Sequence, residues 1–490
     1  MSTEEKKSTT VIDDEKGIVE FKPSFVAAVI CVMSLVIGMS ASIFVFKEKM
    51  HVAMMASLAV TMLVLTMEKC PWNKIEKAII HGGQLMIPTA LILYSIGALM
   101  GAWIASGTVP MIIYWGLKLI SPSFFLTTAC LACIITSMAT GSSWSAIGTA
   151  GVALMGVGMG LGVNPAMTAG AIVSGAAFGD KMSPLSDTTN LAPAVAEGDL
   201  FDHIKAMTYT TYPSMIMALI AFTFLGMKYT GSAEVDTVKE IMYSLSTSFD
   251  LSIFTLIPPI LVLVLAKLKK PAFPILLISG GAAALIAILV QGYSVVDLFI
   301  IMQDGFKSTT GNTSMDKLLS RGGLLNMNYT CSLGIIAMVY GGILEKLGIL
   351  EVCLSKMKFV SKSVGTLVCS TVVGCIIFNI VTASQYMSII LGGRLFIGEF
   401  KKKDMLPQTL SRCLEDGGTV TSLIVPWNVD GAFAAATLGV SVGAFLPFAV
   451  FNWLVPIVSI TFGFMNKFQW KTGEIPSTKT YRDTVQNELN

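Results

Sequence analysis

The chain has 490 residues, of which 53% are hydrophobic and only 13% are charged, and its mean hydropathy is +0.72. Soluble domains carry about 25% charged residues, so this composition excludes an ordinary soluble protein and predicts one embedded mostly in a membrane. The net charge of +2 gives no basic surface of the kind that binds nucleic acid.

Ten apolar segments approach the length of about 20 residues that a helix needs to cross a bilayer. They are 25–46, 50–67, 85–105, 123–140, 209–227, 251–268, 272–290, 326–344, 364–381 and 449–466. Shorter segments rich in glycine or polar residues predict half-helices or re-entrant hairpins at 109–120, 145–163, 165–178, 385–398 and 431–448. The sequence therefore predicts an all-α polytopic membrane protein with broken helices and about 10–13 membrane segments.

Polar stretches divide the chain into units. Residues 1–23 carry charges of both signs, unlike a signal peptide, and predict a cytoplasmic tail. The next units are an N-terminal transmembrane repeat, a polar linker, a C-terminal transmembrane repeat and a C-terminal tail, at 24–230, 231–250, 251–466 and 467–490.

Short motifs recur in the same order in the two halves, 236–242 residues apart. The matched pairs are HGG at 81–83 with RGG at 321–323, TGS at 140–142 with TAS at 382–384, and DxxSxxS at 180–186 with DxxTxxS at 416–422. These matches predict an internal duplication. Two inverted halves around a midplane site are typical of secondary transporters, because their exchange of conformations produces alternating access.

Lysine distribution predicts the orientation of the halves. The loop 345–363 carries four lysines, whereas its counterpart 106–122 carries one. Lysine-rich short loops favour the cytoplasmic side, so we expect the loops 345–363 and 267–271 to lie there. Because equivalent loops of the two halves would then lie on opposite sides of the membrane, we expect the repeats to be inverted and both termini to be cytoplasmic. Lys47 and Lys49 run against this scheme.

The segment 177–193, AFGDKMSPLSDTTNLAP, places charged and hydroxyl side chains between apolar segments. Such groups at bilayer depth are costly and usually functional, and prolines there free backbone carbonyls. Burial favours a protonated carboxyl group and a bound cation favours an ionised one, so H⁺ and Na⁺ compete for Asp180. Na⁺ takes oxygen ligands. The predicted cation and proton site is Asp180, Ser183, Ser186, Asp187, Thr188 and Asn190, with Na⁺ at Asp180, Asp187 and Asn190.

These residues also allow structural interpretations. Asp180 could pair with Lys181 or cap a helix, and Asp187 could cap a polar turn at the interface. A second cluster starts at Thr140, where a helix N-terminus could face an anionic substrate or simply be capped. This substrate or second-half site comprises Thr140, Ser142, Ser143, Thr382, Ser384, Gln385, Asp416, Thr419, Ser422 and Asn428, and Asp430 follows it.

The segments 140–162 (TGSSWSAIGTAGVALMGVGMGLG) and 174–190 (SGAAFGDKMSPLSDTTN) resemble the signature region of the NhaC family of sodium/proton antiporters. Weaker resemblance covers most of the chain, including 82–110 and 411–428. The resemblance implies a fold of inverted repeats with re-entrant hairpins, located in the inner membrane and assembled as a homodimer. It implies that the protein exchanges Na⁺ for H⁺ without a cofactor. It also implies ion-site roles for the predicted residues within 180–190 and for Thr140, Ser142 and Ser143. Related carriers move small organic acids such as malate and lactate, or amino acids such as tyrosine.

One alternative of the same class and one of a different class remain. A Na⁺-coupled organic-anion or amino-acid carrier would use the hydroxyl clusters to contact a carboxylate. An intramembrane aspartyl protease would need Asp180 and Asp416 to share a proton, but position 177 is Ala and the Gly-x-Gly-Asp pattern is not met. We therefore expect a transporter and not an enzyme.

Overall fold

The computed structural model describes residues 11–12, 19–46, 50–228, 235–268, 270–311, 315–316, 319–356 and 363–470. Several sequence predictions fall wholly or partly outside the described residues. These are the tails 1–23 and 467–490, the start of the linker 231–250, parts of the basic loops 267–271 and 345–363, and Lys47 and Lys49.

The first half of the described chain is helical apart from a short antiparallel pair, β1 (Val11–Ile12) with β2 (Val19–Glu20). Its α-helices are α1 (Phe25–Phe44), α2 (Met50–Met67), α3 (Trp72–Ala105), α4 (Thr108–Leu119), α5 (Phe125–Thr140), α6 (Ser143–Ala146), α7 (Val152–Gly160), α8 (Pro165–Met182), α9 (Asp187–Val195) and α10 (Leu200–Met227). A 3₁₀ turn, η1 (Pro122–Phe124), precedes α5, and a π-helical turn, η2 (Ile147–Gly151), joins α6 to α7.

The regular elements among the described residues of the second half are all helices. Its α-helices are α11 (Val235–Ser248), α12 (Ile257–Lys267), α13 (Ala272–Leu289), α14 (Val295–Asp304), α16 (Asn328–Lys346), α17 (Ile349–Lys356), α18 (Val364–Thr382), α19 (Gln385–Lys402), α20 (Pro407–Leu414), α21 (Val420–Ser422), α22 (Val429–Leu438), α23 (Val442–Phe445) and α24 (Val450–Phe464). The single turns are η3 (Ile253–Leu256), η4 (Leu325–Met327), the π-helical η5 (Glu415–Thr419) and η6 (Leu446–Phe448).

By length and composition, seven helical segments in the described part of the chain could cross a membrane. The number rises to nine if two bent helix pairs, 238–265 and 429–448, are each one span. Their bends of 100° and 87° are those of broken spans or re-entrant loops. The prediction of an all-α polytopic membrane protein is confirmed, while the larger segment count stays a prediction.

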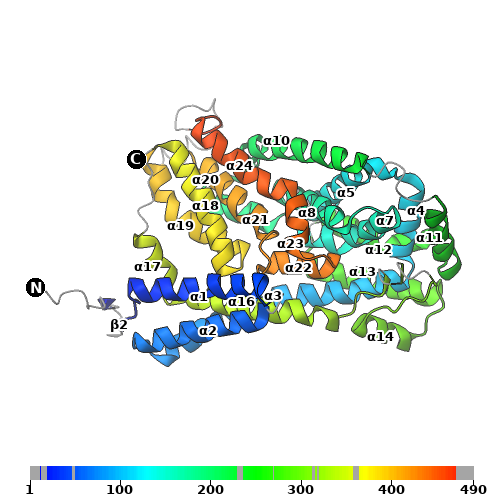
Figure 1. Cartoon of the computed structure of the whole chain (residues 1–490), viewed down its shortest axis with the longest axis horizontal. Helices are drawn as coiled ribbons and strands as arrows, with labels where there is room; N and C mark the ends of the chain where they lie inside the picture. Colours follow the sequence, from blue (N-terminus) through cyan, green and yellow to red (C-terminus); the bar gives the residue numbers. More distant parts are fainter. Residues whose placement is uncertain are drawn as a thin grey trace, which may run out of the picture.

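The helices form two groups along the long axis of the molecule. Figure 1 shows α1, α2, α3 and α16 side by side along one edge, and α3 packs closely against α16. Gly82 and Gly342 meet at this contact, where a Cβ on Gly342 would lie 2.7 Å from the Gly82 Cα. Small residues of this kind let membrane helices approach closely. The other group includes α5 packed on α8, and α18 packed on α19 and α24.

Large apolar side chains cover the outer faces of several helices. Exposed examples are Ile37 on α1, Leu63 on α2, Phe224 on α10, Leu285 on α13 and Phe299 on α14. A soluble monomer rarely exposes so much contiguous apolar surface. Lipid tails are the environment that suits these faces.

The recurring TGS and TAS motifs adopt the same local structure. Helix α5 ends at Gly141 with φ +68°, and α18 ends at Ala383 with φ +54°. The following serines cap the next helices, since Ser142 accepts from the Ser145 N–H and Ser384 accepts from the Met387 N–H. Each motif therefore stops one helix and starts another within two residues.

Candidate functional site

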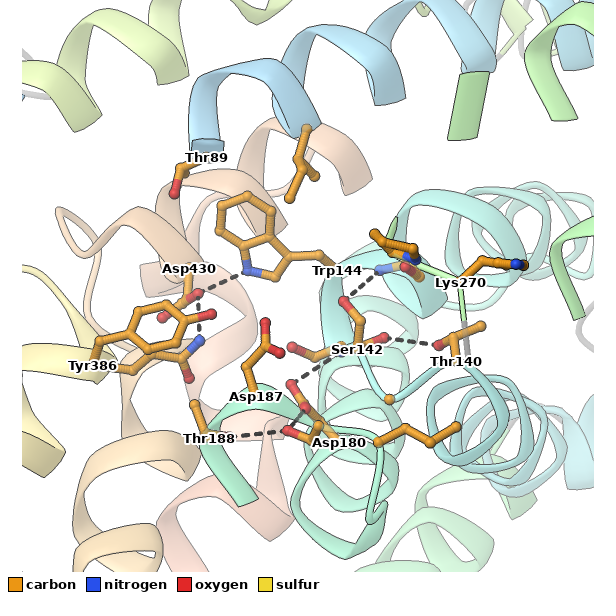
Figure 2. Close-up of a pocket in the computed structure, with 18 residues that line it drawn as sticks. Thr89, Thr140, Ser142, Trp144, Asp180, Asp187, Thr188, Lys270, Tyr386 and Asp430 are labelled. Carbon is orange, nitrogen blue, oxygen red and sulfur yellow. Dashed lines mark hydrogen bonds between the residues drawn. The ribbon is translucent and has the colours of Figure 1, made fainter. Parts of the chain in front are cut away.

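A cavity of about 400 Å³ lies beside the helix break at Gly141, and residues from both halves of the chain line it (Figure 2). The predicted site residues that line it are Thr140, Ser142, Ser143, Asp180, Ser186, Asp187, Thr188 and Gln385. The predicted residues outside its lining are Ser183, Asn190, Thr382, Ser384, Asp416, Thr419, Ser422 and Asn428. The lining therefore comes mainly from the first half.

Asp180 lies near the C-terminal end of α8, where it meets the N-termini of α6 and α9. The Ser143 backbone N–H donates a hydrogen bond to Asp180 Oδ2 at 3.0 Å, and the Ser186 hydroxyl donates to Oδ1 at 2.6 Å. Helix N-termini and hydroxyl donors stabilise an ionised carboxylate, whereas burial favours the protonated acid. Asp180 is only 6% exposed, so its burial favours the protonated form while the donors from Ser143 and Ser186 favour the ionised form.

The N-terminus of α9 places a second carboxylate next to the first. Asp187 is the first residue of this helix, and Figure 2 shows its carboxylate in the middle of the cavity. The Ser186 and Thr188 hydroxyls lie 3.1 Å apart and both line the cavity. The Asn190 amide donates to the carbonyls of Pro184 and Ser186 at 2.9 and 2.7 Å. Asn190 therefore supports the turn that presents the other oxygens.

The second half contributes Asp430, the second residue of α22. Trp144 Nε1 donates to Asp430 Oδ1 at 2.7 Å, and Gln385 Nε2 donates to the same oxygen at 3.3 Å. The Trp144 ring stacks on Phe433 with centroids 4.6 Å apart. Figure 2 shows Tyr386 beside Asp430 at this end of the cavity. The Trp144–Asp430 bond thus joins the two halves of the chain.

Asp416, the predicted counterpart of Asp180, lies in η5 and away from the cavity lining. Lys181 Nζ is 2.8 Å from its Oδ1 and Arg412 Nε is 3.8 Å from its Oδ2, and all three side chains are fully buried. The Thr210 hydroxyl also donates to Oδ1, at 3.1 Å. Asp416 is therefore compensated by two cations, and the ion pair of Lys181 is with Asp416 instead of its neighbour Asp180.

Other predicted residues have structural contacts outside the cavity. Ser384 and Asn428 cap α19 and α22, and the Asn428 amide also donates to the Asn379 backbone carbonyl. The Ser183 hydroxyl donates to the Met138 carbonyl at 2.9 Å. These contacts hold the breaks between helices in place.

Several lining residues were not assigned to the site from the sequence. They include Thr89, Trp144, Lys270, Tyr386 and Asp430. Asp430 could have been assigned to the site from the sequence, because a carboxylate in an apolar segment is a functional candidate by itself. Thr89 follows Pro88 inside the long helix α3, and only the packing of that helix brings it to the cavity.

Hydroxyl and carboxylate groups supply much of the polar lining of the cavity. Among the described residues, no three His, Cys, Asp or Glu side chains converge on a metal position. A cation here would need hydroxyl and carbonyl oxygens as well as carboxylates, which are the ligands of hard ions. Long apolar helices, interrupted helices and a polar cavity between them define a polytopic membrane transporter.

Comparison with known proteins identifies the family. The model of the Na⁺/H⁺ antiporter family matches residues 3–184 and 175–467. The Na⁺/H⁺ antiporter NhaC of Alkalihalophilus pseudofirmus is 40% identical over 425 residues, covering 86% of this chain and 92% of the relative. The malate-2H⁺/Na⁺-lactate antiporter of Bacillus subtilis is 37% identical over 446 residues, covering 91% and 95%. The arginine/ornithine antiporter ArcD of Halobacterium salinarum is 36% identical over 403 residues, covering 82% of each chain.

The chain therefore belongs to the Na⁺/H⁺ antiporter family and is a multi-pass membrane transporter, not an enzyme. The resemblance drawn from the 174–190 motif is confirmed by these matches. The roles of the individual site residues stay predictions.

Proposed function

We propose that this chain exchanges Na⁺ for H⁺ across the cytoplasmic membrane by alternating access. Asp180 carries a proton in one state and takes part in a Na⁺ site in the other. Asp187 and the hydroxyls of Ser186 and Thr188 supply neighbouring oxygens. The opposing ion gradients provide the driving force, and no covalent step is needed.

One observation carries this proposal: the buried carboxylate of Asp180 faces the cavity without a cationic side chain beside it. None of the ion pairs formed by the described residues includes Asp180. A buried carboxylate without a counter-charge is unstable unless it is protonated or binds a cation. H⁺ and Na⁺ therefore compete for the same group, and this competition couples their movement in opposite directions.

The arrangement of the two halves supports alternating access. We propose that they are inverted repeats with about 10–13 membrane segments in all and with both termini in the cytoplasm. The matched helix breaks at Gly141 and Ala383 support a duplication. A homodimer is the assembly expected from the family resemblance.

Purified protein in liposomes that contain a pH-sensitive dye tests the function. A Na⁺ pulse should move protons in the opposite direction, and K⁺ in its place distinguishes a selective site from a general cation leak. Asp180→Asn should abolish the Na⁺-dependent signal, because the amide can neither release a proton nor carry the negative charge that attracts Na⁺. Asp250→Asn, at an exposed residue outside the cavity lining, is the matched control and should retain exchange.

Persistent Na⁺-dependent proton movement in Asp180→Asn would exclude Asp180 from the assigned role. Unitary currents without proton coupling would instead indicate a channel. Absence of any Na⁺-evoked signal in the wild type would overturn the proposed exchange itself.

A second candidate function is the coupled transport of a small organic acid. The cavity of about 400 Å³ exceeds the space that a Na⁺ ion needs, and Lys270 adds a cationic side chain to its lining. Relatives named for malate, lactate and arginine/ornithine exchange make such cargo reasonable candidates. Uptake of labelled malate, lactate or tyrosine that depends on Na⁺ and is reduced in Lys270→Gln would favour this function.

A further inference from the structure

The cavity contains a carboxylate that the proposed exchange at Asp180 does not use. Asp430 is 4% exposed and lines the cavity from the first turn of α22. Its hydrogen-bond donors at Oδ1 are the neutral side chains of Trp144 and Gln385. No ion pair of the described residues includes Asp430. Asp430 therefore has donors that orient it but no fixed counter-charge.

The charges that face the cavity do not balance. The titratable and charged groups of its lining are the carboxylates of Asp180, Asp187 and Asp430, the ammonium of Lys270 and the phenol of Tyr386. Asp180 and Asp430 are buried, whereas Asp187 and Lys270 are exposed, so ionisation of the two buried carboxylates leaves two buried negative charges without a buried cation in the lining. Because uncompensated buried charge is costly, each of these two carboxylates is stabilised by a proton, by a bound cation or by hydrogen-bond donors.

One ion cannot satisfy these carboxylates together. The three side chains do not converge on a single metal position among the described residues. Asp180 is held by Ser143 and Ser186 at one end of the cavity, whereas Asp430 is held by Trp144 at the other (Figure 2). The arrangement therefore offers two separate places for a cation.

We propose that Asp430 is a second proton-binding residue of the cavity, so that each cycle exchanges two protons for one Na⁺. This rests on the proposed Na⁺/H⁺ exchange and adds its stoichiometry. In the proton-loaded state Asp180 and Asp430 each hold one proton. In the other state both have released their protons, Na⁺ binds at the Asp180 end, and the hydrogen bonds from Trp144 and Gln385 stabilise the ionised Asp430. The exchange then moves one net positive charge per cycle and responds to the membrane potential.

The experiment measures the pH gradient that a fixed Na⁺ gradient sustains in liposomes, with the membrane potential held at zero by valinomycin and equal K⁺. At equilibrium the free energy of one Na⁺ equals that of the protons exchanged for it. A tenfold Na⁺ gradient should therefore sustain about half a pH unit in the wild type and about one pH unit in Asp430→Asn. Asp250→Asn, at an exposed residue outside the lining of this cavity, is the control and should retain the wild-type ratio.

The outcomes separate the possible roles of Asp430. A gradient of one pH unit in the wild type, or half a unit in Asp430→Asn, overturns the second proton site. A purely structural role predicts no change of the ratio in Asp430→Asn, since an amide oxygen still accepts the Trp144 hydrogen bond. A wild type that shows no Na⁺-driven pH gradient at all overturns the proposed exchange and the second site with it.

A second measurement does not require an active variant. Protonation of Asp430 weakens the hydrogen bond from Trp144 Nε1, so the indole fluorescence should titrate with pH in Na⁺-free detergent solution. The Trp144 signal is the difference between the wild type and Trp144→Phe, and the same difference is measured in the Asp430→Asn background. Loss of the pH-dependent part in that background supports the assignment, and its persistence overturns it.

Discussion

Replacing Lys181 with methionine should strongly destabilise the folded protein. Its ammonium lies 2.8 Å from Asp416 Oδ1, and both side chains are 0% exposed. Removing one partner of a buried ion pair costs about 3–5 kcal/mol, because the other charge stays buried without compensation. Arg412, 3.8 Å from the second carboxylate oxygen, still faces Asp416. We therefore expect a loss near the lower end, about 3 kcal/mol, or roughly a hundredfold in the unfolding equilibrium.

The assay is reversible unfolding of the purified protein in mixed detergent, followed by circular dichroism. Lys401→Met is the matched control, since Lys401 forms a bond of similar length, 2.7 Å, with Glu197, but both side chains are largely exposed. Exposed ion pairs contribute little, so this control should unfold like the wild type. A Lys181→Met protein as stable as the control would refute the reasoning that the buried pair compensates Asp416.

Two further predictions concern the geometry around Asp180. Ser186→Ala removes the 2.6 Å hydrogen bond to Asp180 Oδ1. Hydrogen bonds to charged groups contribute about 1.5–3 kcal/mol, so the apparent affinity for Na⁺ should change by about tenfold or more in the liposome assay, and an unchanged Na⁺ dependence would contradict this. Gly141→Ala should abolish transport, because φ is +68° and the new Cβ would lie 2.7 Å from Leu185. Gly398→Ala, where nothing lies within 4 Å, is its control and should remain active.

The membrane-protein class and most of the helices could be predicted from the sequence. Apolar runs of about 20 residues predict membrane helices, because a helix of that length and composition can cross the lipid core. Their edges were less well defined, since α3 begins at Trp72 and α10 at Leu200, well before the apolar windows 85–105 and 209–227. Polar residues at those helix ends do not raise the hydropathy, although they continue the same backbone hydrogen bonding.

The location of the carboxylates was decided by the tertiary structure. The pattern DxxSxxS at 180–186 and its counterpart at 416–422 look alike in the sequence. Packing places Asp180 on the cavity without a counter-ion and Asp416 between Lys181 and Arg412. Arg412 lies four residues before Asp416 and is visible in the local spacing, but Lys181, the closer partner, comes from a distant helix.

The sequence by itself determined the family and the position of Asp180 near a helix end, because the 174–190 motif encodes local interruptions and polar groups within one short stretch. Only the folded chain brought Asp430 and Tyr386 to the same cavity as Asp180, across some 200 residues or more of sequence. The physical reason is that a helix break determines where a backbone turns, whereas long-range packing determines which side chains then face one another.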